Sequence, residues 1–148
     1  MPDFVIRAAR ESDWSGFYPF LIDLDTPLDS LELARQRFNH KINSSLHGVF
    51  VAELGGKIVG IAKAHEWDEY LMSGRKQIRF STLSVSPAHR KRGIGKALFE
   101  HTRDWAQSIG ATWFEWYASP SAVEFYRRLG FEGVSCPDPD CPYFEIKF

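Results

Sequence analysis

Residues 90–95 read Arg-Lys-Arg-Gly-Ile-Gly, which combines fixed positive charge with two glycines spaced for a tight turn. A strand-like run at 78–85 comes before this turn, and an amphipathic helix pattern follows it. A turn built this way points several main-chain N–H groups at one spot, at the positive end of a helix. Because glycine has no Cβ, the backbone can approach a ligand closely. The pattern therefore predicts a pyrophosphate site with added charge from Arg90, Lys91 and Arg92.

The length and charge of the chain limit the classes of protein to which it can belong. With 148 residues it suits one core, so we expect residues 1–148 to form a single domain. A net charge of −1 argues against a generally basic nucleic-acid binder. Residues 1–74 hold 7 Lys/Arg and 11 Asp/Glu, whereas residues 75–148 hold 11 and 8. This division suits an enzyme with an anionic cofactor and a cationic substrate, although a difference this small also arises by chance.

The sequence gives no sign of a membrane segment or a metal site. Residues 1–12 include Asp3 and Glu11 and lack the apolar core of a signal peptide, and no apolar run approaches the roughly 20 residues of a membrane span. Cys136 and Cys141 are close together, but two thiols without a nearby histidine do not make a zinc site. We expect a cytoplasmic protein with two unbonded cysteines that binds no metal, membrane or nucleic acid.

Capping residues and hydrophobic patterns predict the elements that position the turn. Ser12 and Ser30 are each placed to cap a helix, and Gly55-Gly56 between two strand patterns is typical of a hairpin. Residues 94–109 give the strongest helix pattern, and Gly110 follows them. In chain order we expect a strand at 4–7, a helix from Ser12 to Leu21, a helix after Ser30, strands at 49–54 and 57–64, a loop at 67–75, a strand at 77–85, a helix at 94–109, a strand at 111–117, a helix capped by Ser119 and closed by Gly130-Phe131, and a strand at 143–148. This order describes a mixed α/β domain.

Three motifs lie in order on these elements. Residues 83–87, Leu-Ser-Val-Ser-Pro, end the strand before the turn, and Arg-x-x-Gly-x-Gly at 90–95 forms the turn itself. Residues 122–131 read Ala-x-x-Phe-Tyr-x-x-x-Gly-Phe on the last helix. Together these motifs resemble those of the GNAT N-acetyltransferases. The resemblance covers nearly the whole chain and is closest from Ile78 to Phe131.

The resemblance implies an α/β fold and acetyl-CoA as co-substrate. The sheet would be mixed but mostly antiparallel, with six to seven strands splayed between the fourth and fifth, and about four helices would accompany it. Backbone groups of Leu83 and Val85 would pair with the pantetheine arm, and an N–H near Leu83 would polarise the thioester carbonyl. The residues expected to bind the cofactor are Leu83, Ser84, Val85, Arg90, Lys91, Arg92, Gly93, Ile94, Gly95, Lys96, Ser119 and Tyr126.

The resemblance also implies a catalytic role for Tyr126. In relatives this tyrosine protonates the thiolate that leaves. A thiol has a pKa of about 8.5 and a phenol about 10, so Tyr126 is better described as a hydrogen-bond donor or late acid. The alternative is a core tyrosine whose hydroxyl has a structural partner.

The sequence departs from the family at the position of the base. Relatives often carry Glu near residues 80–82, where this chain has Phe-Ser-Thr. An alkyl amine must lose a proton before attack, at a cost of about 4–5 kcal/mol at pH 7. The candidate bases are Glu66 and Glu115, and the alternatives are His65, Asp68, Glu69 and a water chain. Each of these side chains can instead be a solvated surface charge.

Acidic and aromatic residues interleave in two segments that resemblance assigns to the acceptor site. Carboxylates and aromatic faces attract an ammonium group. We therefore expect a cationic amine acceptor, either a small molecule or a protein, bound by Asp25, Asp29, Trp67 and Asp68. The alternative is that these acids only keep loops solvated.

These expectations describe an N-acetyltransferase that moves an acetyl group from acetyl-CoA to a primary amine by direct attack in a ternary complex. A covalent acetyl-enzyme is not expected, because no cysteine lies near the proposed thioester. The alternative is an acyl-CoA-binding sensor or partner module without turnover, which the missing carboxylate would explain. Since relatives often dimerise, a homodimer is a further hypothesis.

Overall fold

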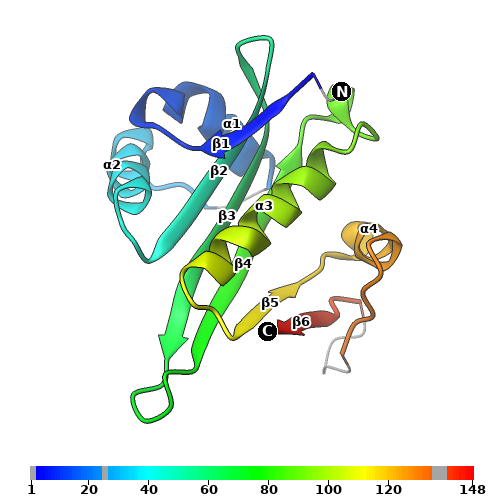
Figure 1. The fold of residues 1–148 in the computed structure, drawn as a ribbon. Coiled ribbons are helices and arrows are strands. Elements are labelled where there is room, and N and C mark those ends of the chain that lie inside the picture. Colours follow the sequence, from blue (N-terminus) through cyan, green and yellow to red (C-terminus); the bar gives the residue numbers. More distant parts are fainter. Residues whose placement is uncertain (1–2, 25–26, 135–139) are drawn as a thin grey trace.

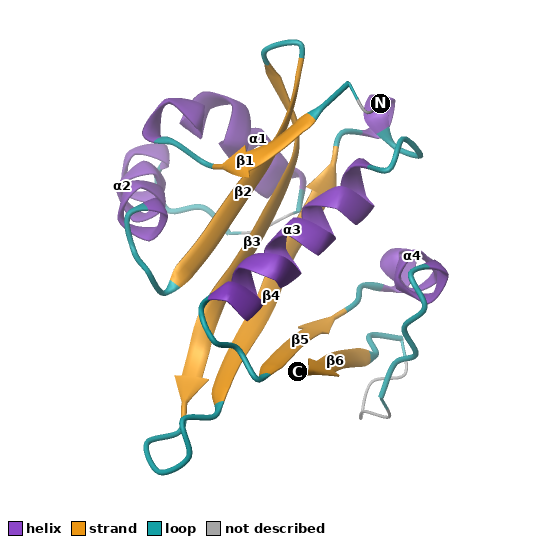
Figure 2. Cartoon of the chain, viewed as in Figure 1, coloured by secondary structure: helices purple, strands orange, loops and turns teal. Residues whose placement is uncertain are grey.

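The computed structural model describes residues 3–24, 27–134 and 140–148. These residues form one six-stranded sheet with the order β1-β2-β3-β4-β5-β6 (Figures 1 and 2). Neighbouring strands are antiparallel except for β4 and β5, which are parallel. The strands are β1 (Val5–Ala8), β2 (His47–Leu54), β3 (Lys57–Glu69), β4 (Lys76–Val85), β5 (Trp113–Tyr117) and β6 (Tyr143–Lys147).

Helices cover both faces of the sheet (Figure 1). Within the described ranges the α-helices are α1 (Trp14–Asp23), α2 (Leu31–Ile42), α3 (Ile94–Ser108) and α4 (Val123–Arg128), with short 3₁₀ turns at 11–13, 87–89 and 120–122. The mixed α/β fold expected from the sequence is therefore confirmed, with six strands and four α-helices in the described part. None of the described helices is both long and apolar enough to cross a membrane.

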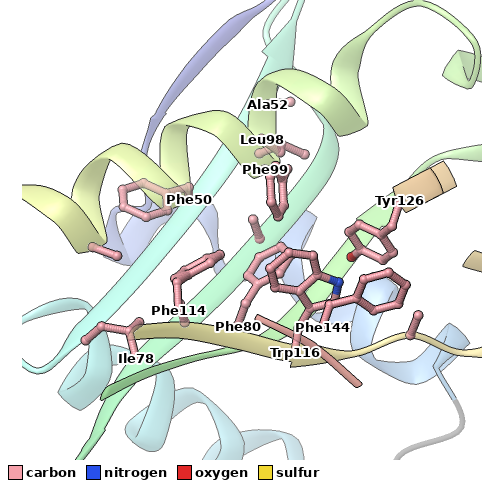
Figure 3. Close-up of a cluster of buried hydrophobic side chains, with 14 of the residues drawn as sticks. Phe50, Ala52, Ile78, Phe80, Leu98, Phe99, Phe114, Trp116, Tyr126 and Phe144 are labelled. Atoms are coloured by element: carbon pink, nitrogen blue, oxygen red, sulfur yellow. The ribbon is translucent and has the colours of Figure 1, made fainter. Parts of the chain in front are cut away.

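The sheet separates two hydrophobic cores. The larger core lies under α3 and α4 and contains a group of aromatic side chains around Trp116 (Figure 3). The rings of Trp116 and Phe144 stack at 5.5 Å, and Phe99 on α3 meets Trp116 edge to face at 5.1 Å. The smaller core lies under α1 and α2, around Phe17 and Phe38. Burying each large side chain contributes roughly 1.5–3 kcal/mol, so the two cores hold both helical layers against the sheet.

The fourth and fifth strands separate part-way along their length. β4 pairs with β5 only from Gln77 to Arg79, although β4 continues to Val85. A register shift in the β3–β4 pairing leaves Ser81 without a partner on β3, which marks a β-bulge in β4 just beyond this point. Beyond Glu115, the partner of Arg79, β5 pairs only with β6, which continues beside it as far as Tyr117. The splay expected from the sequence is therefore present.

Several capping predictions are confirmed. The Ser30 hydroxyl accepts a hydrogen bond from the Leu33 N–H at 3.0 Å and so caps α2. After α4, Gly130 takes a φ of 95°, and the Phe131 N–H bonds to the Tyr126 carbonyl at 3.1 Å. This arrangement is the Schellman end predicted for that helix.

Two capping predictions are wrong. The first helix begins through a 3₁₀ turn, where the Asp13 carboxylate accepts the Arg10 N–H at 2.7 Å, so Ser12 lies within the turn and does not cap it. Ser119 makes no side-chain capping bond, because a 3₁₀ turn follows it and its Oγ lies 3.3 Å from that of Ser121.

The predicted loop at 67–75 is also wrong for its first residues. β3 continues to Glu69, since Asp68 pairs with Gln77 and Glu69 with Lys76 on β4. A register shift around Trp67 interrupts the alternation of the strand. The sequence pattern missed this extension because the bulge breaks its period of two.

Candidate functional site

The turn between β4 and α3 has the backbone that an anion site needs. Lys91 and Gly93 adopt positive φ angles of 63° and 83°, and Gly93 is the N-cap residue directly before α3. The first N–H groups of a helix have no partner within the helix and lie at its positive end. The Arg90 Nε donates to the Val85 carbonyl at 3.1 Å and ties the turn to the end of β4. The turn therefore presents free amides where a phosphate can bind.

A cavity of about 400 Å³ opens beside this turn. Most of the residues predicted to bind the cofactor line it, namely Leu83, Ser84, Val85, Arg90, Lys91, Gly93, Ile94, Gly95, Ser119 and Tyr126. Arg92 and Lys96 do not line it, and the Lys96 ammonium instead lies 3.9 Å from the Glu100 carboxylate. The structure thus gathers one end of β4, the turn and α4 around a single space.

A second cavity of about 190 Å³ occupies the opening between β4 and β5. Residues 80–83 line it from β4, and Trp116 and Tyr117 line it from β5. Leu83, Ser119 and Tyr126 line both this cavity and the one beside the turn. The two spaces are therefore adjacent, and the splay of the strands opens directly beside the anion site.

Tyr126 lies between these two cavities. It is 5% exposed, and its ring packs on Trp116 at 5.1 Å and on Phe144 at 5.6 Å (Figure 3). Burial raises the pKa of Tyr126 well above its ordinary value of 10. The phenol therefore stays protonated at every physiological pH and can donate a hydrogen bond into the opening between the strands.

A third cavity of about 540 Å³ lies between the sheet and helices α1 and α2. Its walls are mostly apolar and include Phe17, Leu21 and Phe38. Ser81 and Thr82 line this cavity and the one between the strands, which makes these two spaces neighbours as well. A molecule in the third cavity would therefore approach the splayed strands from the side of α1 and α2.

Lys63 lines the third cavity and was not among the residues predicted from the sequence. It pairs across the sheet with Thr82 on β4. Burial and the nearby Lys41 lower the pKa of Lys63 to about 8. A single lysine inside the apolar run 58–64 was the signal that could have identified it.

The two carboxylates proposed as bases are both engaged in ion pairs. Glu66 lies 3.2 Å from the Lys76 ammonium and lines none of the three cavities. Glu115 is 3% exposed and accepts hydrogen bonds from Arg79 at 2.8 Å and from the Tyr143 hydroxyl at 2.6 Å. These contacts join β4, β5 and β6, so the structure gives both carboxylates structural partners.

The alternative bases also lie away from the cavities. His65 stacks on His47 with ring centroids 5.8 Å apart, and burial lowers the pKa of His65 below its ordinary value. Asp68 and Glu69 are exposed at the end of β3. None of these three residues lines the cavities described above.

The described residues among those predicted to bind the acceptor lie on separate parts of the fold. Asp29 pairs with Arg37 at 2.6 Å, and Trp67 is half exposed with the Arg79 guanidinium 4.5 Å from its ring. Asp68 is exposed at the far end of β3, and Asp25 lies outside the described residues. None of the described members of this set lines the third cavity.

The sequence of this chain matches that of a known protein family. Residues 45–133, more than half of the chain, match the family model described as an acetyltransferase (GNAT) domain. The chain belongs to the GNAT acetyltransferase family. The class of enzyme expected from the sequence, an acetyl-CoA-dependent N-acetyltransferase, is thus confirmed at the level of the family.

This GNAT domain matches most of the length of one relative and less than half of the length of another. Glucosamine 6-phosphate N-acetyltransferase of Trypanosoma brucei brucei is 29% identical over 131 residues, which cover 87% of this chain and 89% of that protein. N-acetyltransferase family 8 member 2 of Rattus norvegicus is 41% identical over 90 residues, which cover 58% of this chain and 39% of that protein. The GNAT chain therefore spans well under half of the length of the rat relative.

Solved structures share the fold. Glucosamine-6-phosphate N-acetyltransferase from Arabidopsis thaliana superposes with a TM-score of 0.79 at 25% identity, covering 91% of this chain and 95% of that one. The structure of yncA from Salmonella typhimurium, solved with its cofactor acetyl-CoA, gives a TM-score of 0.77 at 16% identity, covering 97% of this chain and 93% of that one.

Proposed function

We propose that this protein transfers an acetyl group from acetyl-CoA to a primary amine by direct attack in a ternary complex. The observation that supports this proposal is the row of three neighbouring cavities along the splayed strands. The anion site lies at one end, the mostly apolar cavity under α1 and α2 at the other, and the opening between β4 and β5 lies between them. Two substrates can therefore meet from opposite ends without a covalent enzyme intermediate.

The residues around the first two cavities suit acetyl-CoA. The amides at the start of α3 would bind the pyrophosphate, with Lys91 supplying charge. The backbone of Leu83 lies where β4 has no strand partner from β5, so its groups are available to the pantetheine arm. Acetyl-CoA supplies the acetyl thioester. Gly95 fits the same design, because a Cβ there would lie 3.3 Å from the Phe125 ring and press the turn away from α4.

In the proposed reaction the amine nitrogen forms a bond to the acetyl carbon while the carbon–sulfur bond breaks. The nitrogen gives one proton to water, and the departing sulfur gains one. The Tyr126 hydroxyl would donate a hydrogen bond to that sulfur. Because a phenol with a raised pKa is a much weaker acid than a thiol, we assign Tyr126 the stabilisation of the thiolate, and the proton itself comes from solvent.

Water is the proposed proton acceptor for the amine. Among the described residues that line the three cavities there is no aspartate or glutamate. Glu66 and Glu115 would have to leave their ion pairs to serve as bases, so we favour the water route that the sequence left open. The relatives named for glucosamine 6-phosphate support an amine as the acceptor.

Release of free thiol from acetyl-CoA tests this proposal. Purified protein would be mixed with acetyl-CoA and a panel of primary amines, thiol release would be followed colorimetrically, and the N-acetylated amine would be identified by mass spectrometry. We expect amine-dependent release with one acetylated product per thiol. Tight coenzyme A binding without release on any amine would favour the alternative, an acyl-CoA-binding module without turnover. The lack of a carboxylate among the described lining residues is the observation that supports this alternative.

A further inference from the structure

The walls of the cavity under α1 and α2 are mostly apolar, and the described charged side chains that line it are basic. The charged residues among its described lining are Arg37, Lys41 and Lys63, with no acid beside them. Arg37 is already compensated, because it pairs with Asp29 at 2.6 Å. The uncompensated charge therefore belongs to Lys41 and Lys63.

Lys63 is the deeper of these two cations. It lies in the middle of β3, between Val49 on β2 and Thr82 on β4, and is half-buried. It has no ion pair within the described part of the chain, and Lys41 adds a second positive charge close to it. A half-buried cation without a counter-ion weakens the fold, so this position favours a ligand that brings a negative charge.

The place of Lys63 also fixes where that negative charge must lie in the ligand. Its cross-strand partner Thr82 lines the opening between β4 and β5, directly before Leu83. A group bound to Lys63 is therefore close to the point where the amine must meet the thioester. The anion and the amine of the acceptor must then be near neighbours in one molecule, with the rest of that molecule between α1 and α2.

We propose that the acceptor is an amine that also carries a nearby carboxylate and an apolar body, and that Lys63 binds its carboxylate. This inference rests on the proposed acetyl transfer and names the substrate class of that site. A carboxylate brings one negative charge, which balances the one positive charge of Lys63. It replaces the cationic acceptor expected from the sequence, since Asp29 and Asp68, the described acids of that prediction, do not line this cavity.

The test compares three amines of similar size: L-phenylalanine, L-phenylalaninamide and phenethylamine. The same thiol-release assay would be run on the native protein, on Lys63→Met, and on Lys57→Met, an exposed lysine at the start of the same strand. For the native protein and Lys57→Met we expect kcat/KM to favour the carboxylate by about 10-fold or more, mainly through KM. Lys63→Met should lose this preference, and Lys63→Arg should recover part of it.

Two results would overturn the inference. One is an equal or better rate with the amide, or with glucosamine 6-phosphate. The other is an equal fall in kcat for all three amines in Lys63→Met, which would place Lys63 in proton transfer instead.

A binding measurement keeps this inference separate from the proposed function. Calorimetric titration of N-acetyl-L-phenylalanine in the presence of coenzyme A does not need turnover. We expect binding that weakens about 10-fold or more in Lys63→Met and is unchanged in Lys57→Met. If no amine releases thiol, Lys63-dependent binding would still support the carboxylate site, and equal binding by all variants would refute it.

Discussion

Tyr126 is the residue on which the proposed chemistry depends most directly. Its hydroxyl lies in an aromatic surrounding between two cavities, with no hydrogen-bond partner among the described residues, and its pKa is raised by burial alone. Most buried hydroxyl groups have a hydrogen-bond partner, so the Tyr126 hydroxyl is available to a ligand.

We predict that Tyr126→Phe lowers kcat by about 10²-fold and leaves the affinity for acetyl-CoA almost unchanged. The reason is that removing one donor from a developing negative charge has an effect of this order. Steady-state kinetics and calorimetry measure the two quantities. The thermal midpoint should not fall, since no protein hydrogen bond is lost. An unchanged kcat would reduce Tyr126 to a packing residue.

Lys63 should weaken the fold at neutral pH. Its pKa is lowered from 10.5 to about 8, so between these values the unfolded chain binds more protons than the folded one and stability rises with pH. We predict that Lys63→Met raises the free energy of unfolding by about 1–3 kcal/mol at pH 7. This gain is full below pH 8 and disappears towards pH 10.5. Urea unfolding across this range checks the prediction, and a variant less stable than the native protein at pH 7 would contradict it.

Glu115 is predicted to stabilise the sheet rather than to take a proton. Its carboxylate joins Arg79 and Tyr143 and is 3% exposed. Glu115→Gln should lower the free energy of unfolding by about 2 kcal/mol, because the buried charge-assisted bonds are weakened. The exposed control Glu124→Gln, which loses a 3.7 Å contact with Arg128, should change it by under about 0.5 kcal/mol. Full stability of Glu115→Gln with loss of turnover would instead make Glu115 the base.

At the scale of elements, local signals predicted what depends on local contacts. The Gly55-Gly56 hairpin, the Ser30 cap and the Schellman end at Gly130 all follow from residues a few positions apart. The extension of β3 to Glu69 could not be predicted in this way, because it depends on pairing with β4 across a bulge at Trp67. The ion pair and hydrogen bonds of Glu115 also depend on distant contacts, because its partners lie on β4 and β6.

The turn before α3 gives a prediction with a matched control. Gly93 and Gly56 both have positive φ, 83° and 78°, and a Cβ added to either meets no atom within 4 Å. Only Gly93 lines the cavity at the anion site. Leucine at either position should therefore lower the thermal midpoint by a similar amount, through the strained backbone. Calorimetry should find coenzyme A affinity lost in Gly93→Leu and kept in Gly56→Leu, and equal affinity in both would refute the anion site.

At the scale of the whole molecule, the sheet holds two binding regions on either side of one opening. The first is lined by the turn and α4, and the second by α1 and α2. This arrangement predicts that both substrates must be bound before either product leaves. Initial-rate plots with both substrates varied should give intersecting lines. Parallel lines, or an acetylated protein isolated without amine, would contradict direct transfer.

The sequence predicted one of these regions better than the other. The cofactor side is built from a contiguous motif at 90–95 and from the ends of two strands, so spacing alone could identify it. The acceptor side depends on Lys63, whose neighbours come from α2, β2 and β4 and are distant in the chain. Single-domain folding on its own, cytoplasmic location and a homodimer stay predictions.

A crystal structure of the complex with coenzyme A would show directly whether the turn before α3 binds the cofactor. We expect pyrophosphate oxygens within hydrogen-bond distance of the main-chain N–H groups between Lys91 and Gly95. We also expect the sulfur in the opening between β4 and β5, beside the Tyr126 hydroxyl. Coenzyme A bound elsewhere, or a bound structure in which β5 pairs with β4 as far as Val85, would contradict this expectation.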